Sequence, residues 1–85
     1  MNTIKLLLVD DHAIVRAGLR ALLATAADMC VVGEAEDGHQ AAREAERLRP
    51  DVVLMDLAMP LLNGVEAARQ IAANTPRVKV LMLSS

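Results

Sequence analysis

Two apolar runs that each end in aspartate constrain the fold of this chain most strongly. The first, Leu6–Val9, leads into Asp10 and Asp11, and the second, Val52–Met55, leads into Asp56. An apolar run without polar alternation is typical of a strand buried on both faces of a parallel sheet. In open parallel sheets, ligands and chemistry collect at the carboxyl ends of the strands. We therefore predict that these aspartates share one acidic pocket.

A pocket of this kind is expected to bind a cation that balances its negative charge. Three neighbouring carboxylates repel one another and raise each other's pKa unless a positive charge intervenes. A hard divalent ion with oxygen ligands, such as Mg²⁺, is the simplest solution. Asp56 alone could equally cap a turn. His12 is a further candidate ligand by residue type, but we interpret it as a partly exposed residue at a loop edge, because no other His or Cys lies near it in the sequence.

Seven segments are predicted to alternate as strands and helices. The predicted strands are 4–10, 30–34, 51–56 and 77–83, and the predicted helices are 12–25, 39–49 and 64–73. Helices between apolar strands predict an α/β fold with right-handed crossovers and a parallel sheet. Such a domain seldom ends on an uncovered strand, so we expect the chain to be cut short, with a helix, a strand and a final helix beyond Ser85.

Helical periodicity predicts which residues of each helix face inward. In 12–25 the apolar face holds Ile14, Val15, Gly18, Leu19, Leu22 and Leu23, with Arg16 and Arg20 on the other side. Gly18 weakens helix propensity, and we expect a close backbone contact to explain it. The inward residues of the other two helices are Ala41, Ala42, Ala45 and Leu48, and then Val65, Ala68, Ile71 and Ala72.

Composition excludes several classes of protein. The 85 residues are 54% apolar with no Phe, Trp or Tyr, which argues against disorder and against base stacking on single strands. The net charge of −2 includes no basic patch, so nucleic-acid binding by this segment is not expected. Cys30 is the only cysteine; we expect a free thiol in the core and a reducing cytosol. No stretch resembles a signal peptide or a transmembrane helix.

The sequence lacks a P-loop, and its other candidate groups for phosphate or metal chemistry have simpler interpretations. A P-loop needs a glycine-rich turn ending in Gly-Lys-Ser/Thr, where this chain has Asp10-Asp11-His12. Ser84 is a nucleophile by residue type, but without a nearby His base it is better interpreted as a hydrogen-bond donor. Glu34, Glu36 and Asp37 could form a second acidic cluster. We interpret them as solvated loop charges, because no apolar strand end groups them.

Taken together, these residues resemble the receiver domain of bacterial response regulators. Asp10-Asp11 follows the first predicted strand, Asp56 in DLAMP follows the third, and Ser84 follows the fourth. The segments DDHAIVRAGLRALL, VVGEAEDG and PDVVLMDLAMPLLNGVEAARQI resemble the NarL/FixJ subfamily, whose members carry a LuxR-type DNA-binding domain downstream. The resemblance implies a CheY-like (flavodoxin-like) three-layer α/β/α fold with strand order 2-1-3-4. Residues 1–85 would be a receiver truncated after strand four, without the fifth strand, the last helices or a DNA-binding domain.

The resemblance also implies roles for individual residues. Asp56 matches the phosphoacceptor and a ligand of Mg²⁺. Asp11 matches the direct Mg²⁺ ligand, and Asp10 matches the acid that reaches the metal largely through water. Ala58, two residues after the acceptor, would give its backbone carbonyl to the metal. Ser84 matches the switch hydroxyl that turns toward the phosphoryl group.

The implied function is that of a cytoplasmic signalling domain in a two-component phosphorelay. It would accept a phosphoryl group on Asp56 from a sensor histidine kinase and lose it by slow autodephosphorylation, without being an enzyme in the usual sense. The full-length parent would regulate transcription, touching DNA only through the downstream domain. One departure is that the family's lysine after strand five, which contacts the phosphoryl group, has no match here. Lys5 and Lys79 are the only lysines, and both lie in predicted strands, so neither replaces it.

Two alternatives remain open at the level of sequence. The first is a phosphorylation-independent interaction or dimerisation module, in which the apolar edge of the fourth strand pairs two chains as a homodimer. The missing lysine favours it, and the three converging carboxylates disfavour it. The second is a metal-dependent phosphatase, which the lack of a general acid or base near Asp56 disfavours.

Overall fold

The alternation of strands and helices is confirmed by the computed structural model, which describes residues 3–56 and 64–83. The strands are β1 (Ile4–Val9), β2 (Met29–Ala35), β3 (Val52–Asp56) and β4 (Lys79–Leu83). The helices are α1 (Ala13–Leu23), α2 (Gly38–Leu48) and α3 (Gly64–Asn74). All seven predicted segments are present, each with bounds that differ from the prediction by at most two residues. Within the described ranges, no helix is long and apolar enough to cross a membrane.

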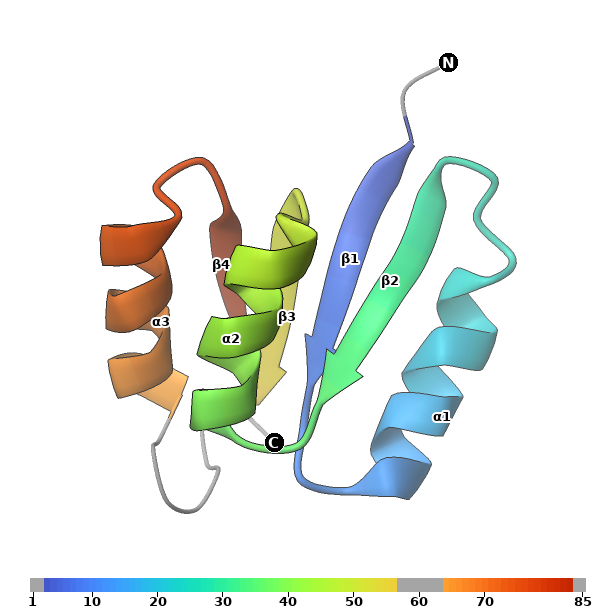
Figure 1. The fold of residues 1–85 in the computed structure, drawn as a ribbon. Coiled ribbons are helices and arrows are strands. Elements are labelled where there is room, and N and C mark those ends of the chain that lie inside the picture. The colour runs from blue at the N-terminus through green and yellow to red at the C-terminus, as the bar shows by residue number, and fades with distance from the viewer. Residues whose placement is uncertain (1–2, 57–63, 84–85) are drawn as a thin grey trace.

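The sheet is parallel, and its strands lie in the order β2-β1-β3-β4. The chain steps from β1 to β2 in one direction and then crosses back over β1 to reach β3 and β4. Because crossovers between parallel strands are right-handed as a rule, the reversal puts α1 on one face of the sheet and α2 and α3 on the other. Figure 1 shows α2 and α3 side by side, with α1 apart from them next to β2. The predicted layers and strand order are therefore confirmed.

The core lies mainly between the sheet and the pair α2 and α3. The strands contribute Leu7, Val9, Val53 and Met55, and the helices contribute Ala41, Ala45, Ala67 and Ile71. Leu6 and Leu8, which alternate with the core residues of β1, are buried on the opposite face. The predicted inward face of α2 is confirmed, since Ala42 and Leu48 pack against the same cluster.

The inward face of α3 was predicted only in part. Ile71 is buried as expected, whereas Val65 is 59% exposed and Ala72 is also exposed. Ala67, four residues before Ile71, takes the inward position instead. Residues four apart share one side of a helix, so the pair Ala67 and Ile71 sets the buried stripe.

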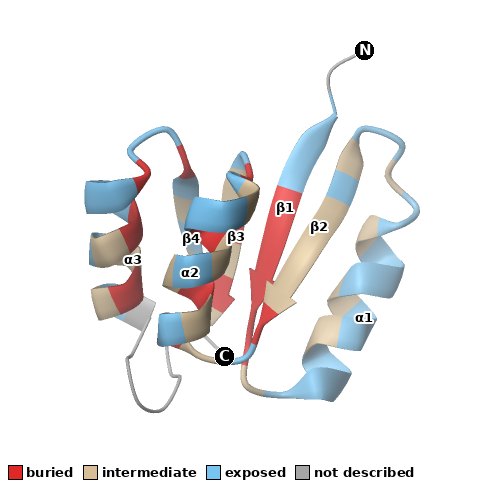
Figure 2. Cartoon of the chain, viewed as in Figure 1, coloured by how far each residue is buried: buried red, intermediate tan, exposed pale blue. Residues whose placement is uncertain are grey.

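Helix α1 covers its face of the sheet loosely. None of its residues is buried, and Figure 2 shows the helix mostly pale blue. Ile14 is 82% exposed and Leu22 is 67% exposed, and Leu81 of β4 is 56% exposed. The close contact expected at Gly18 is absent, because a Cβ placed there would meet nothing within 4 Å.

Cys30 does not lie in the core. It is a free cysteine on β2, a strand at the border of the described sheet, and its side chain is exposed. The prediction of a buried thiol is therefore wrong. The apolar residues around it in the sequence suggested burial, but burial on an outer strand depends on which helix covers it, and α1 covers this strand only partly.

Candidate functional site

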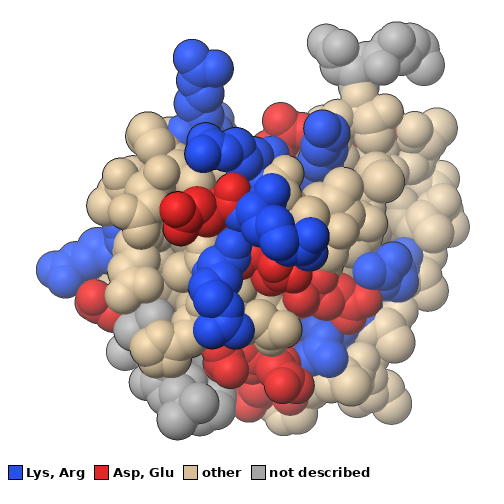
Figure 3. All heavy atoms as spheres, in the orientation of Figure 1, with Lys and Arg blue, Asp and Glu red and all other residues tan. Residues whose placement is uncertain are grey.

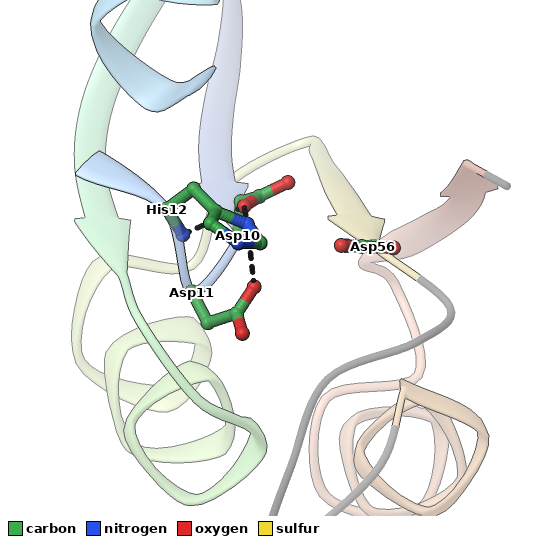
Figure 4. A group of neighbouring side chains, drawn as sticks. All are labelled: Asp10, Asp11, His12 and Asp56. Carbon is green, nitrogen blue, oxygen red and sulfur yellow. Dashed lines mark hydrogen bonds and ion pairs between the residues drawn. The ribbon is translucent and has the colours of Figure 1, made fainter. Parts of the chain in front are cut away.

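The three aspartates meet at the carboxyl ends of β1 and β3. Val9 of β1 is paired with Met55 of β3, so the two neighbouring strands reach their ends together. Asp10 follows β1 directly, and Asp56 is the last residue of β3. Oxygens of Asp10, Asp11 and Asp56 and a ring nitrogen of His12 all lie within 4.8 Å of one another (Figure 4). The sheet register therefore creates the acidic pocket that the sequence predicts.

Asp10 is held by both its side chain and its backbone. Its Oδ1 accepts a hydrogen bond of 2.8 Å from the backbone N–H of His12, the residue that precedes α1. Its backbone N–H donates to the carbonyl of Ala35 at 3.1 Å. Its own carbonyl accepts from Arg16 Nη1 at 2.6 Å. A buried carboxylate with this many restraints presents its remaining oxygen in a fixed direction.

Asp11 carries an oxygen that lacks a hydrogen bond. Its Oδ1 is buried and accepts no hydrogen bond from the described part of the chain, although His12 Nδ1 lies 3.0 Å away. Buried polar atoms in folded proteins nearly always have a partner. Carboxylate oxygens are the ligands that Mg²⁺ prefers. The donor set and this unsatisfied oxygen fit a hard divalent cation.

Glu34 is not the solvated loop charge that we predicted. It lies on β2, where its two oxygens accept hydrogen bonds from Arg16 Nε at 2.9 Å and Arg20 Nε at 2.8 Å. The Arg20 hydrogen bond, followed by that of Arg16, holds the pKa of Glu34 below its usual range despite partial desolvation. Arg16 and Arg20 thus face β2 rather than the side of α1 turned away from the sheet. Arg16 links this ion pair to the acidic pocket.

The other two acids that we interpreted as solvated loop charges, Glu36 and Asp37, lie at the start of α2. Asp37 caps α2, since its side chain accepts from the backbone N–H of Gln40 at 2.8 Å. The backbone N–H of Glu36 donates to the Gln40 side chain at 2.9 Å, and the Glu36 side chain is exposed. Asp37 therefore serves as a helix cap, and the exposed Glu36 side chain is solvated, as predicted.

The pocket opens into a cavity of about 430 Å³. Its polar lining comes from the strand ends, and its apolar lining comes from α1 and β4; the residues are Asp10, His12, Ile14, Val15, Leu19, Asp56 and Leu83. On the face that carries α2, a group of acidic side chains marks the edge where the strands end, and Lys and Arg are interspersed with acids elsewhere (Figure 3). The acidic side chains of the site therefore line a cavity that a cation can enter from solvent.

Two predicted site residues, Ala58 and Ser84, lie outside the described residues. His12 is exposed, as predicted, but its ring joins the acidic cluster, which agrees with the alternative that we considered less favoured. The signal that we underweighted is its position: a residue that directly follows two strand-end aspartates and precedes a helix lies within reach of both carboxylates.

Comparison with known proteins agrees with the fold. The model for the response regulator receiver domain matches residues 6–85. The response regulator protein VraR of Staphylococcus aureus is 51% identical over 83 residues, which are 98% of this chain and 40% of VraR. The chain thus spans less than half the length of this relative.

Solved structures of receiver domains superpose closely on the chain. The response regulator domain of Thermotoga maritima CheB gives a TM-score of 0.94 at 43% identity, covering 99% of this chain and 62% of that one. The receiver domain of the putative response regulator NarL from Mycobacterium tuberculosis gives 0.92 at 31% identity, covering 99% and 68%. The predicted CheY-like fold and the NarL/LuxR-type resemblance are both confirmed. This chain belongs to the response regulator receiver domain family, the signalling module of two-component systems.

Proposed function

We propose that this receiver accepts a phosphoryl group on Asp56 from the phosphohistidine of a sensor histidine kinase. The observation that carries the proposal is the meeting of Asp10, Asp11 and Asp56 at the ends of β1 and β3. Asp56 ends a buried strand, so its position is fixed by the sheet. A structural role alone would not require three carboxylates at one point, since they repel one another.

The transfer requires one bond to form and one to break. A carboxylate oxygen of Asp56 attacks the phosphorus, the phosphorus–nitrogen bond of phosphohistidine breaks, and the departing imidazole keeps the electron pair and takes up a proton. Attack of water on the resulting acyl phosphate returns the carboxylate, which accounts for slow autodephosphorylation. Phosphoryl transfer depends mainly on positioning and on charge neutralisation, and Mg²⁺ supplies the neutralisation when bound.

The residues of this chain position the reactants. Asp11 offers a buried oxygen without a hydrogen bond, and Asp10 is held by Arg16 and by the backbone of His12. We assign Asp10, Asp11, Asp56 and the carbonyl of Ala58 to the metal. Ser84 follows β4, next to β3 in the sheet, and we assign its hydroxyl to the phosphoryl oxygens.

We propose that the output of this domain is made by a longer parent protein. Binding of the phosphoryl group by the Ser84 hydroxyl would move a loop and change a surface elsewhere on the domain. VraR, of which this chain spans 40%, is named a response regulator protein. We propose that the parent protein is a cytoplasmic transcription regulator that contacts DNA through a separate domain.

A second function is favoured by the apolar residues on the α1 side of the sheet. Ile14, Leu22, Leu81 and Leu83 are between 42% and 82% exposed. Exposed apolar surface of this kind marks interaction sites when it is contiguous. A phosphorylation-independent homodimer would bury it, and the receiver scaffold would then act as a dimerisation module.

Titration with Mg²⁺, followed by NMR of the ¹⁵N-labelled chain, distinguishes the two functions. Shifts confined to the neighbourhood of Asp10, Asp11 and Asp56 would support the phosphoacceptor site. The control is Asp51→Asn at the opposite end of β3, where the Asp51 side chain accepts from the Lys5 N–H at 2.8 Å and an amide oxygen can replace it. No response to Mg²⁺, together with a dimeric mass by light scattering, would favour the interaction module.

A further inference from the structure

His12 is the one member of the cluster that is not an acid. Its Nδ1 lies 3.0 Å from Asp11 Oδ1 and 3.2 Å from Asp10 Oδ1. The backbone hydrogen bond from its N–H to Asp10 Oδ1 fixes the residue beside the strand end. Figure 4 shows its ring together with both carboxylates and Asp56 across from them on the neighbouring strand.

These ion-pair spacings are also compatible with ligands around one ion. Two adjacent ligands of an octahedral ion bonded at about 2.1 Å lie about 3.0 Å apart. Nδ1 has this separation from Asp11 Oδ1 and nearly the same from Asp10 Oδ1. A cation bonded to both carboxylates could therefore bond Nδ1 with only a small movement of the ring.

His12 lies at ion-pair distance from both carboxylates but makes a side-chain hydrogen bond only to Asp10. Nδ1 makes a hydrogen bond to Asp10 Oδ1. Toward Asp11 Oδ1 it is closer, yet that oxygen accepts no hydrogen bond from the described residues. The approach to Asp11 is close without the direction that a hydrogen bond requires. A shared cation would satisfy both the nitrogen and this buried oxygen.

We propose that His12 is a nitrogen ligand of this site, so that the site binds first-row transition ions such as Ni²⁺ in addition to Mg²⁺. The inference rests on the metal site of the proposed function. Imidazole nitrogen suits zinc, copper, iron and nickel, whereas Mg²⁺ selects oxygen. The His12 side chain is 65% exposed, so water can serve the second ring nitrogen while Nδ1 faces the ion.

Calorimetric titration with Ni²⁺ and with Mg²⁺ tests the proposal. For His12→Ala we expect the dissociation constant of Ni²⁺ to rise about tenfold or more, while that of Mg²⁺ changes by less than about threefold. His39→Ala, which removes the only other histidine, on the exposed surface of α2, is the matched control and leaves both constants unchanged. His12→Gln, which keeps a polar side chain, should lose the nickel preference as well.

A spectroscopic measurement on the unmodified chain needs no variant. With the diamagnetic ion Zn²⁺, the ¹⁵N resonance of His12 Nδ1 should shift, and that of His39 should not. Equal Ni²⁺ affinity in the wild type and His12→Ala, with Mg²⁺ still bound, would overturn the role of His12 and leave the acidic site intact. Failure of both ions to bind would overturn the proposed metal site and this inference together.

Discussion

Arg16 Nη1 donates a hydrogen bond of 2.6 Å to the backbone carbonyl of Asp10. The same guanidinium donates from Nε to Glu34 on β2, and its side chain is only 15% exposed. One arginine on the first turn of α1 therefore connects the helix, the neighbouring strand and the acidic pocket.

Arg16→Ala should weaken both the fold and the metal site. Loss of two charge-assisted hydrogen bonds predicts a decrease of about 2 kcal/mol in the free energy of unfolding, measured in urea. Because Asp10 would lose a backbone restraint, we also expect the dissociation constant of Mg²⁺ to rise about tenfold. Arg20→Ala is the control, since Arg20 is 49% exposed and pairs with Glu34 without contacting Asp10. Equal Mg²⁺ affinity in both variants and the wild type would contradict this role for Arg16.

Glu34 should make stability depend on pH. The hydrogen bonds from Arg20 and Arg16 hold the pKa of its carboxyl below its usual value. A lowered pKa in the folded state contributes stability that is fully present above the unfolded value and is lost as the pH falls through the folded value. At pH 7, Glu34→Gln should therefore lower Tm by roughly 4–8 °C, which corresponds to about 1 kcal/mol. The difference should shrink steadily below about pH 4.5; a difference that is constant from pH 7 to pH 3 would show that the charge is not its source.

Gly18→Ala should stabilise the chain. Gly18 lies in the middle of α1, and an added Cβ meets nothing within 4 Å. Alanine in a helix interior is favoured over glycine by roughly 0.5–1 kcal/mol. Gly33→Ala gives the opposite expectation, because a Cβ there would lie 2.5 Å from Leu48 Cδ1 and 3.4 Å from Leu7 Cδ1. Urea unfolding of both variants provides the measurement, and destabilisation by Gly18→Ala would show that the glycine has a contact beyond the described residues.

The sequence predicted those features that depend on local pattern. The apolar runs predicted the strands. The aspartates that follow them predicted the pocket, because the carboxyl ends of adjacent parallel strands lie at the same edge of the sheet. The pairing of Arg16 with Glu34 could not be predicted, since it depends on β2 lying beside β1 and on the rotation of α1. The same reason applies to His12, whose ring direction is set by the turn into α1. The inward position of Ala67 depends on how α3 is rotated against the sheet, and apolar residues on more than one side of this helix leave that rotation open.

The most direct test of the central claim is intact-mass spectrometry after incubation with a small-molecule phosphodonor, with and without Mg²⁺. We predict that the wild type gains one phosphoryl group only with Mg²⁺, that Asp56→Asn gains none, and that the control Asp51→Asn behaves as the wild type. A carboxylate must be ionised and its charge balanced by a cation before it can attack phosphorus, so both requirements should appear together. Absence of uptake in the wild type, or equal uptake in Asp56→Asn, would contradict the assignment of Asp56 as the phosphoacceptor.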